Sequence, residues 1–378
     1  MEAMTPRSQG NSLLIVAHRF SLGFGGVPES ILLLARELAK LDIRLDVLSR
    51  DGFVSAAGAL DALPPAVHSP ATDRPDVADY GCVLVAGAWN PMAWLIAIQA
   101  RRKGVRLVYT PKGNLACAEF KRWRDLKKFP YLATIELSLL AMSDLIVFSS
   151  NLERHASLLA ALFNRKSIVI PEPFLGPQLD PAGARRLGPV RFGFMAEIAP
   201  RKGLAELIEA FTAWQRRGNP DAELYVAGEP RPGSERYYAG ILRKAAEAPK
   251  PAKIVFLGAL RGKSRDDFYE HIDFFACPTR FESFGLTPLE ALWHGKPVMV
   301  TKNLGVLEFV SDESSMISLG KGTLDEICNA LAAAAAARDG YLAAASRWRM
   351  CLNSRLSGDE VSALFARAID MKEAARRV

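Results

Sequence analysis

The segment from Phe281 to Ala291 carries two carboxylates, Glu282 and Glu290, eight positions apart. Between them, a Phe-Gly-Leu stretch at 284–286 predicts a turn that leads into a helix. Such a turn presents backbone N–H groups and the positive end of a helix dipole, which together bind phosphate. A carboxylate beside them accepts hydrogen bonds from sugar hydroxyls, so the pattern is typical of a nucleotide-sugar site.

A purely structural interpretation of the same residues stays open. Thr287, Pro288 and Glu290 fit a capping box, with Thr at the N-cap, Pro at N1 and Glu at N3. In that case Glu290, placed in the first helical turn, only stabilises the start of its own helix.

Further candidates follow predicted strands in the second half of the chain. Arg201 and Lys202 come after the strand 190–195 and precede a helix, which suits a diphosphate. Gly228 and Glu229 follow the strand 224–227, where ligand-facing loops of a doubly wound sheet occur. A solvated basic turn and simple tight turns are the alternatives.

A glycine-rich loop, 23–29, lies between the first predicted strand and the first helix. Gly25 and Gly26 allow close approach of the backbone to a ligand. Pro28 occupies the position of the third glycine in a Rossmann fingerprint, so the loop is not a clean dinucleotide site.

Basic and aromatic residues alternate in the segment from Glu119 to Tyr131, EFKRWRDLKKFPY. This mixture fits a helix that rests on an anionic membrane surface, and a solvated helix face explains it equally well.

Composition narrows the class of protein. The chain has 378 residues and a formal net charge of +7, which favours two domains and an anionic partner. Nucleic acid is the weakest such partner, because no recognition motif is present. The five cysteines and five histidines are dispersed, so we expect neither disulfides nor a bound metal. No apolar run is long enough to span a bilayer and no signal pattern is found, so we expect a cytosolic protein.

Strand and helix patterns alternate along both halves of the chain, which predicts an α/β protein with two doubly wound, Rossmann-like domains facing across a cleft. The predicted strands are 13–17, 44–48, 82–86, 106–109, 145–148, 190–195, 224–227, 254–257, 274–276 and 298–300. We place the first domain at 1–170. The segment 171–189 is rich in Pro and Gly and is read as a linker. The second domain then covers 190–354. A final helix covers 355–378, with a crossing back to the first domain left open.

Taken together, these motifs resemble the family 4 retaining glycosyltransferases of GT-B fold. The strongest match is PTRFESFGLTPLEALWHGKPVMVTKNLGVLEFV, residues 278–310, which is similar to the E-x7-E block of that family. FMAEIAPRKGLAELIEAF, residues 194–211, resembles its phosphate-binding block. Residues 87–153 are similar to bacterial members that build exopolysaccharide or lipopolysaccharide.

The resemblance implies the reaction and the partners, with the acceptor on the side of the first domain, 1–170, and the nucleotide sugar bound by the second domain, 190–354. A hexosyl group would move with retention from a nucleotide diphosphate sugar to a saccharide or lipid-linked acceptor, without a cofactor or metal. The protein would be cytoplasmic, with peripheral binding to the inner face of the membrane left open. The implied donor-binding residues are Glu290, Phe284, Gly285, Leu286, Gly25, Gly26, Gly228 and Glu229, and the implied catalytic residues are Glu282, Lys202, Arg201 and Lys112.

Two departures from the family pattern affect these roles. Ala196-Glu197 stands where the family usually has Gly-Arg, so we expect Arg201 to replace the lost cation. A histidine of the first domain is also missing, and Lys112 is our candidate substitute. Because of these departures, two alternatives remain: a non-catalytic nucleotide-sugar-binding subunit and a nucleotide-sugar epimerase of the same fold.

Overall fold

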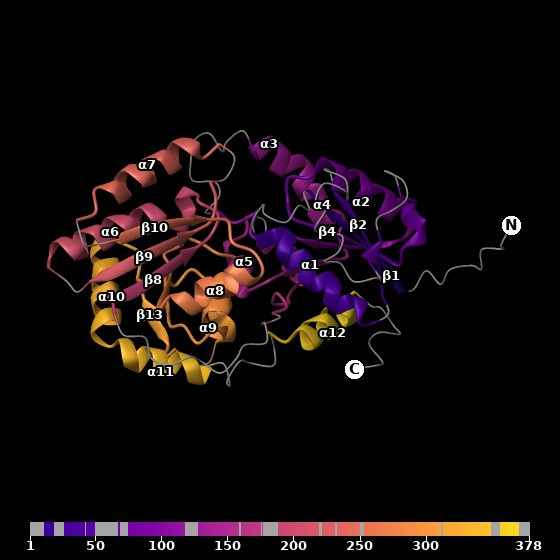
Figure 1. The fold of residues 1–378 in the computed structure, drawn as a ribbon. Coiled ribbons are helices and arrows are strands. Elements are labelled where there is room, and N and C mark those ends of the chain that lie inside the picture. Colours follow the sequence, from indigo (N-terminus) through magenta and orange to yellow (C-terminus); the bar gives the residue numbers. More distant parts are fainter. Residues whose placement is uncertain are drawn as a thin grey trace. The chain divides into compact units, whose positions relative to one another are not determined.

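In the computed structural model, the chain divides into two compact units (Figure 1). The first unit comprises Met1–Leu175 and Ser354–Val378, and the second comprises Gly176–Asn353. The break between them falls inside the segment 171–189 that composition predicts as a linker. The residues that the structure describes are 11–18, 26–41, 43–49, 67–68, 75–117, 128–158, 160–174, 176, 188–218, 221–230, 233–249, 253–310, 313–348 and 356–369.

The first unit is built on a parallel sheet of seven strands in the order β3-β2-β1-β4-β5-β6-β7. In β1, alternate side chains enter different cores: Leu13 and Ile15 face one, and Leu14 and Val16 face the other. Apolar residues on both faces are what a sheet covered by helices on both sides requires. The strands are β1 (Ser12–Ala17), β2 (Arg44–Ser49), β3 (Val67–His68), β4 (Cys82–Ala86), β5 (Arg106–Thr110), β6 (Leu145–Phe148) and β7 (Ser167–Val169).

Helices pack on both faces of this sheet. The last described helix, α12, packs beside α1 although more than 300 residues separate them (Figure 1), and Phe365 joins the core that Ile31 and Leu34 line. The α-helices are α1 (Gly26–Ala39), α2 (Pro91–Lys103), α3 (Phe129–Tyr131), α4 (Leu137–Met142), α5 (Asn151–Ala156) and α12 (Gly358–Ala368). Shorter turns are η2 (Val77–Asp79), the π-helical η5 (Leu132–Glu136) and η6 (Ala160–Lys166).

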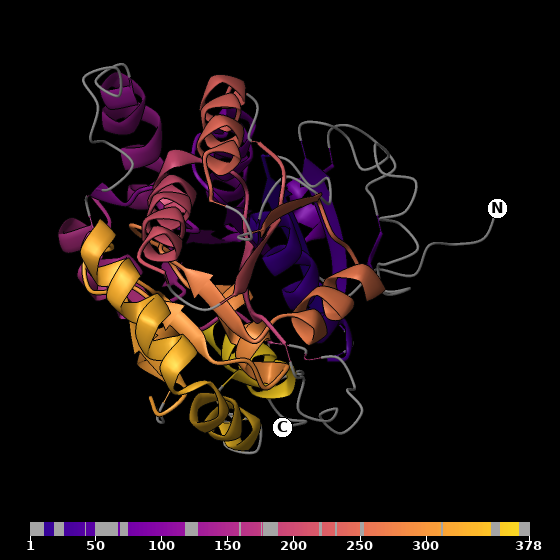
Figure 2. The same ribbon diagram turned by 60° about the vertical axis from the view of Figure 1, so that its left-hand side comes forward.

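The second unit has a parallel sheet of six strands in the order β10-β9-β8-β11-β12-β13. Helix α6 lies beside α10 in both Figure 1 and Figure 2, where they are rose and amber. The strands are β8 (Val190–Met195), β9 (Ala222–Ala227), β10 (Lys253–Gly258), β11 (Phe274–Cys277), β12 (Val298–Val300) and β13 (Met316–Ser318). The helices are η7 (Pro200–Lys202), α6 (Leu204–Arg216), α7 (Glu235–Ala246), α8 (Lys263–His271), α9 (Leu286–Trp293), η8 (Gly305–Phe309), α10 (Leu324–Ala336) and α11 (Arg338–Trp348).

The predicted fold class is confirmed, because both sheets are parallel and both have the doubly wound order. The sequence patterns do not predict β3, β7 and β13, because these strands are only two or three residues long and show too little periodicity. No described helix is long and apolar enough to cross a membrane.

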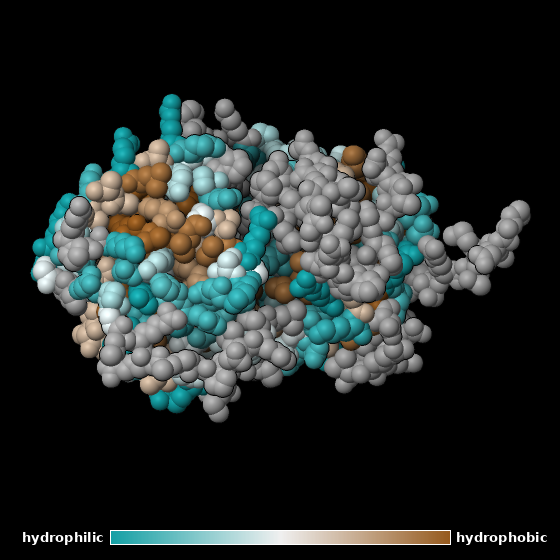
Figure 3. Space-filling model, viewed as in Figure 1, coloured by the Kyte–Doolittle hydropathy of each residue, from teal (hydrophilic) through white to brown (hydrophobic). Residues whose placement is uncertain are grey.

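The edge strand β10 accounts for an apolar area on the surface of the second unit. Figure 3 shows brown, hydrophobic atoms gathered over β10 and α7. Leu257 of β10 and Leu242 of α7 are 39% and 41% exposed. A strand at the end of the sheet order has a neighbour on one side only, so its apolar residues are covered less than those of the inner strands.

Candidate functional site

The switch point of the second sheet brings the predicted site residues together. The strand order reverses between β8 and β11, and ligands of such sheets bind outside the strand carboxyl ends at this place. The loop after β8 carries Arg201 and Lys202, and the loop after β11 carries Glu282. A hydrogen bond from the Arg280 amide to the Arg201 carbonyl, 2.9 Å long, joins the two loops directly.

Glu282 is the centre of a charged cluster. Its carboxylate accepts a hydrogen bond from the Lys202 ammonium and lies 3.9 Å from Nη1 of Arg201. Burial raises the pKa of the Glu282 carboxyl, but the charges of Lys202 and Arg201 outweigh burial, so its pKa lies below the ordinary value. Glu282 is therefore an ionised acceptor, with two cations beside it.

Glu197 shares one of these cations. Its Oε2 atom lies 3.4 Å from Nη2 of Arg201. Arg201 thus faces two carboxylates, Glu197 and Glu282. Glu197, which stands where the family usually has arginine, is therefore paired with Arg201, the cation that we expected to compensate for the lost arginine.

Two glycines allow the site loops to approach each other. A Cβ atom on Gly203 would lie 2.1 Å from the Pro278 carbonyl oxygen, and one on Gly228 would lie 1.9 Å from that of Ala196. Both residues also have positive φ, 76° and 127°. Gly228 therefore has a structural role here, and the neighbouring Glu229 is an exposed residue whose carbonyl accepts from the Ile198 amide.

Backbone hydrogen bonds to residues 303–306 fix the turn 282–286. The amide of Glu282 donates to the Asn303 carbonyl at 2.9 Å, and the Phe284 carbonyl accepts from the Val306 amide at 2.8 Å. The Phe284 side chain is buried and contacts the ring of Phe309. These contacts use the Glu282 amide and the Phe284 carbonyl, and they leave the amides of residues 284–286 for another partner.

That amide side is the predicted anion site. Helix α9 begins at Leu286, and its N-cap, Gly285, has a φ of 107°. Within the described part of the chain, the amides of Phe284, Gly285 and Leu286 meet no acceptor. The first amides of a helix lack internal partners and carry the positive end of its dipole. Three donors and two nearby cations fit a diphosphate.

The capping-box interpretation is wrong. The N-cap is Gly285, not Thr287, so Glu290 is the fifth residue of α9 and not N3. Its carboxylate instead reaches α8: Oε1 accepts from Nη2 of Arg265 at 2.6 Å, and Oε2 accepts from Nε of Arg265 at 3.0 Å. The buried Tyr269 hydroxyl donates to Oε2 at 2.7 Å. Sequence reasoning missed both partners, because α8 shows no motif that identifies them.

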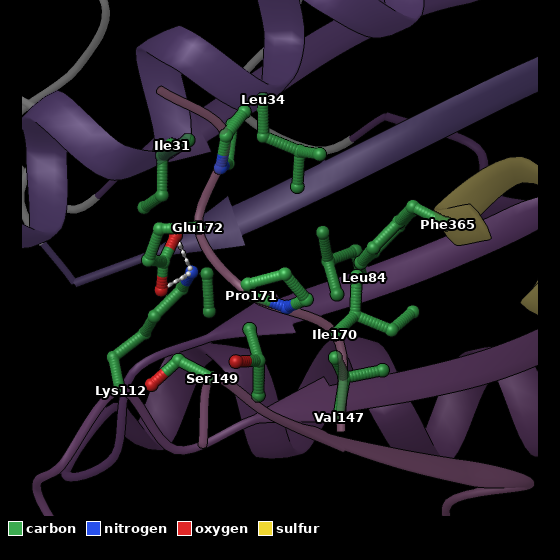
Figure 4. Close-up of a pocket in the computed structure, with 13 residues that line it drawn as sticks. Ile31, Leu34, Leu84, Lys112, Val147, Ser149, Ile170, Pro171, Glu172 and Phe365 are labelled. Atoms are coloured by element: carbon green, nitrogen blue, oxygen red, sulfur yellow. Dashed lines mark hydrogen bonds and ion pairs between the residues drawn. The ribbon is translucent and has the colours of Figure 1, made fainter. Parts of the chain in front are cut away.

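Lys112 belongs to a different cluster, in the first unit. Its ammonium donates to both carboxylate oxygens of Glu172 at 2.6 and 2.8 Å (Figure 4). It also donates to Oγ of Ser30 at 2.8 Å. All three N–H donors of the ammonium are thereby used. Its predicted role as a replacement cation stays a prediction, and that role requires Glu172 to release it.

The space beside this ion pair is small. Ile31, Leu84, Val147 and Phe365 line it together with Lys112 (Figure 4), and its volume is about 10 Å³. That is close to the smallest volume that holds one water molecule. The pocket therefore has no room for a nucleotide sugar in this conformation.

The remaining residues predicted from the sequence lie only partly within the described part of the chain. Gly25 lies outside the described residues, and Gly26 is the first residue of α1. Of the basic-aromatic segment only 128–131 is described. There Phe129 is 45% exposed, and the Lys128 ammonium lies 5.9 Å from the Trp89 ring centre.

Comparison with known proteins identifies the class. Residues 178–339 match the family model described as glycosyl transferases group 1. This match covers most of the second unit and includes residues 278–310, so the predicted resemblance is confirmed at the level of group 1 glycosyl transferases.

Two relatives share this part of the sequence. The mannosylfructose-phosphate synthase of Agrobacterium fabrum is 31% identical over 134 residues, which cover 32% of this chain and 29% of that protein. The lipopolysaccharide core biosynthesis mannosyltransferase LpsB of Rhizobium meliloti is 34% identical over 101 residues, covering 26% and 28%. The matched regions thus span less than a third of these relatives.

Solved structures extend the likeness to nearly the whole chain. Anabaena Alr3699/HepE, crystallised with UDP and glucose, superposes with a TM-score of 0.74 over 95% of this chain and 99% of that one, at 18% identity. Sucrose-phosphate synthase from Thermosynechococcus elongatus gives 0.71 at 14% identity, over 97% and 100%. At these identities the likeness shows the fold, which is the two-unit GT-B fold of glycosyltransferases.

Proposed function

We propose that this protein is a retaining glycosyltransferase that moves a hexosyl group from a nucleotide diphosphate sugar to a saccharide or lipid-linked acceptor in bacterial cell-surface polysaccharide synthesis. One observation carries the proposal. Lys202 and Arg201 converge on Glu282 directly beside the amides of 284–286, so cations, amide donors and a carboxylate occupy one strand end of the second sheet. A diphosphate needs the first two, and a sugar hydroxyl needs the third.

The roles follow from this arrangement. The amides of 284–286 and the Lys202 ammonium hold the diphosphate and stabilise the negative charge that grows on it as the sugar leaves. Glu282 accepts a hydrogen bond from a hydroxyl of the transferred sugar, and Glu290 accepts hydrogen bonds from the ribose hydroxyls. The leaving phosphate takes the proton of the acceptor, so the reaction uses no carboxylate nucleophile and no metal. An assay with excess chelator is expected to keep its rate, and identification of the product anomer tests retention.

Replacement of Lys202 tests the donor site. The Lys202→Met variant is expected to bind a nucleotide diphosphate sugar about ten to a hundred times more weakly, because it loses a charge-assisted hydrogen bond to phosphate. Thermal shift against a panel of nucleotide diphosphate sugars measures this, since a ligand of the folded state raises Tm.

Lys263→Met is the matched control, because the Lys263 side chain is 88% exposed on α8. It is expected to behave like wild type. Equal ligand shifts in wild type and Lys202→Met would remove Lys202 from the site. No shift with any panel member in wild type would reject the proposed donor class.

The acceptor side is proposed from the relatives and from the basic-aromatic segment. Two of the relatives are named as lipopolysaccharide glycosyltransferases, and an acceptor anchored in a membrane would explain a segment rich in lysines and aromatic residues. Co-sedimentation with vesicles containing anionic lipid, at low and high salt, tests this part. Absence of binding at low salt would contradict peripheral membrane association without affecting the donor proposal.

A second candidate is a nucleotide-sugar-binding subunit without transferase activity. The Glu197–Arg201 pair favours it, because an acidic group then reduces the positive charge available to the diphosphate. Donor binding without turnover against a panel of acceptors would support this alternative. Conversion of the donor sugar to an epimer without acceptor would instead identify an epimerase.

A further inference from the structure

Glu290 is held by α8 through contacts to both of its carboxylate oxygens. Arg265 donates to the two oxygens at 2.6 and 3.0 Å, and the Tyr269 hydroxyl donates to one of them at 2.7 Å. The side chains of Arg265 and Glu290 are 20% and 15% exposed. Each retains an edge at the surface, although most of the pair is enclosed.

The geometry limits how the carboxylate can turn. A two-pronged arginine–carboxylate contact fixes the plane of both groups, whereas a single contact permits rotation. Tyr269 is itself fully buried, stacks on His294 and lies 3.2 Å from the Thr287 carbonyl. The partner groups are therefore rigid, and they fix the direction in which the Glu290 oxygens meet a ligand.

We propose that Arg265, assisted by Tyr269, is the positioning residue that makes Glu290 selective for the ribose hydroxyls of a nucleoside diphosphate. The inference rests on the proposed function and deepens it. A carboxylate held in one orientation accepts a hydrogen bond from a hydroxyl without the entropy cost of ordering a mobile side chain. A ligand that lacks that hydroxyl leaves the fixed oxygen without its donor, and such a site discriminates strongly.

The place of α8 in the fold explains how Arg265 reaches Glu290. This helix begins at Lys263, shortly after Gly258 ends β10, and it leads into β11, the strand that precedes the site turn. It also contacts β8, so it lies at the switch point of the sheet. The guanidinium compensates the charge of Glu290 next to a site that must also admit an anionic diphosphate.

The test is a comparison of ribose and deoxyribose ligands. Titration calorimetry is performed with the nucleoside diphosphate that binds wild type most tightly and with its 2′-deoxy and 3′-deoxy forms. Wild type is expected to lose about tenfold to a hundredfold in affinity with at least one deoxy form, the range for a hydrogen bond to a charged group. Glu290→Gln is expected to lose most of this discrimination.

The Arg265→Leu variant tests the proposed role of Arg265 directly. It is expected to bind the ribose ligand about tenfold more weakly and to distinguish the deoxy form by less than about threefold. Arg265→Lys keeps the charge but not the planar fork, so it is expected to lose discrimination as well. Arg261→Leu, at an exposed position four residues earlier, is the control and is expected to match wild type.

The outcomes distinguish a failure of the proposed role of Arg265 from a failure of the proposed function. If Arg265→Leu and Arg265→Lys keep the wild-type ratio between ribose and deoxy ligands, Arg265 only stabilises the fold and the inference is overturned, while the proposed function stands. If wild type binds no nucleoside diphosphate, both are overturned. Should Arg265→Leu fail to fold, Tyr269→Phe removes one donor in an isosteric ring and is expected to reduce the discrimination by about threefold or more; an unchanged ratio there also overturns the inference.

Discussion

At the residue scale, three of the candidate site residues are held in close ion pairs. Lys202 pairs with Glu282, Arg265 with Glu290, and Lys112 with Glu172. Removing one member of an enclosed pair leaves the other charge without compensation, which costs more than the pair contributes. Loss of activity in a single variant of these residues must therefore be separated from loss of folding, and this is why the tests above compare ligands as well as variants.

A buried histidine gives the folding stability of the protein a predicted pH dependence. His294 is 2% exposed, its Nδ1 contacts the Glu290 carbonyl at 2.8 Å, and Tyr269, Asp266 and Lys296 surround it. Burial lowers its pKa below the ordinary value of 6.5, and hydrogen bonding to Glu290 and the charge of Asp266 offset this only in part.

As pH falls below about 6.5, the unfolded chain therefore takes up a proton at His294 before the folded protein does. The stability present above that pH is lost during acidification. His294→Asn, which keeps a donor for the Glu290 carbonyl but does not titrate, is expected to show a flatter decline of Tm between about pH 7 and about pH 5. Parallel declines in wild type and variant would show that His294 does not contribute to the pH dependence.

At the element scale, glycines decide how closely the loops at the strand ends pack. Gly203 closes the turn between η7 and α6 and faces the Pro278 carbonyl, which belongs to the loop that carries Glu282. The same close approach allows Lys202 to reach Glu282. The geometry of the cluster thus depends on the absence of a single Cβ atom.

Gly203→Ala measures this dependence. Its Cβ would lie 2.1 Å from a backbone oxygen, so we expect a loss of about 2–5 kcal/mol in the free energy of unfolding, from positive-φ strain and overpacking together. Gly218→Ala is the matched control, because its φ is 75° against 76° and nothing lies within 4 Å of its Cβ.

The control is expected to cost only about 1 kcal/mol, the backbone strain alone. Urea unfolding of the two variants gives the comparison. Equal losses would mean that the loop at Pro278 yields easily and that the close approach is not needed for stability.

At the scale of the whole molecule, the first unit is assembled from both ends of the chain. Helix α12 contributes Val361 and Phe365 to the core that α1 lines, and Nη2 of Arg106 donates to the Ala368 carbonyl at 3.0 Å. Phe174 and Ser357 form a bridge within the same unit. The first unit therefore cannot complete its core before residues 356–369 are available.

Phe365→Ala is expected to destabilise the first unit by about 3–5 kcal/mol, because it creates a cavity in a buried core. The neighbouring Leu364 is 39% exposed, so Leu364→Ala is expected to change stability by no more than about 0.5 kcal/mol. Native-state hydrogen exchange locates the effect: amides of β1, β2 and α1 are expected to lose protection, and those of the second unit to keep it. Loss of protection in the second unit as well would show that the two units unfold together.

Much of the fold was determined by the sequence itself. The strands 82–86, 145–148, 190–195 and 298–300 have the predicted bounds, because a short apolar run between turn residues is a local signal. The positions of Lys202, Glu282 and Gly285 at strand and helix ends follow from the same local patterns.

Only the tertiary structure decided which groups meet. Glu290 pairs with Arg265, 25 residues earlier, and not with its own helix start, and Lys112 pairs with Glu172, 60 residues later. Likewise α12 belongs to the first unit, far from its neighbours in sequence. Periodicity and turn residues report the contacts of a residue with nearby positions, whereas these pairings depend on the strand order, which brings distant elements to one edge of a sheet.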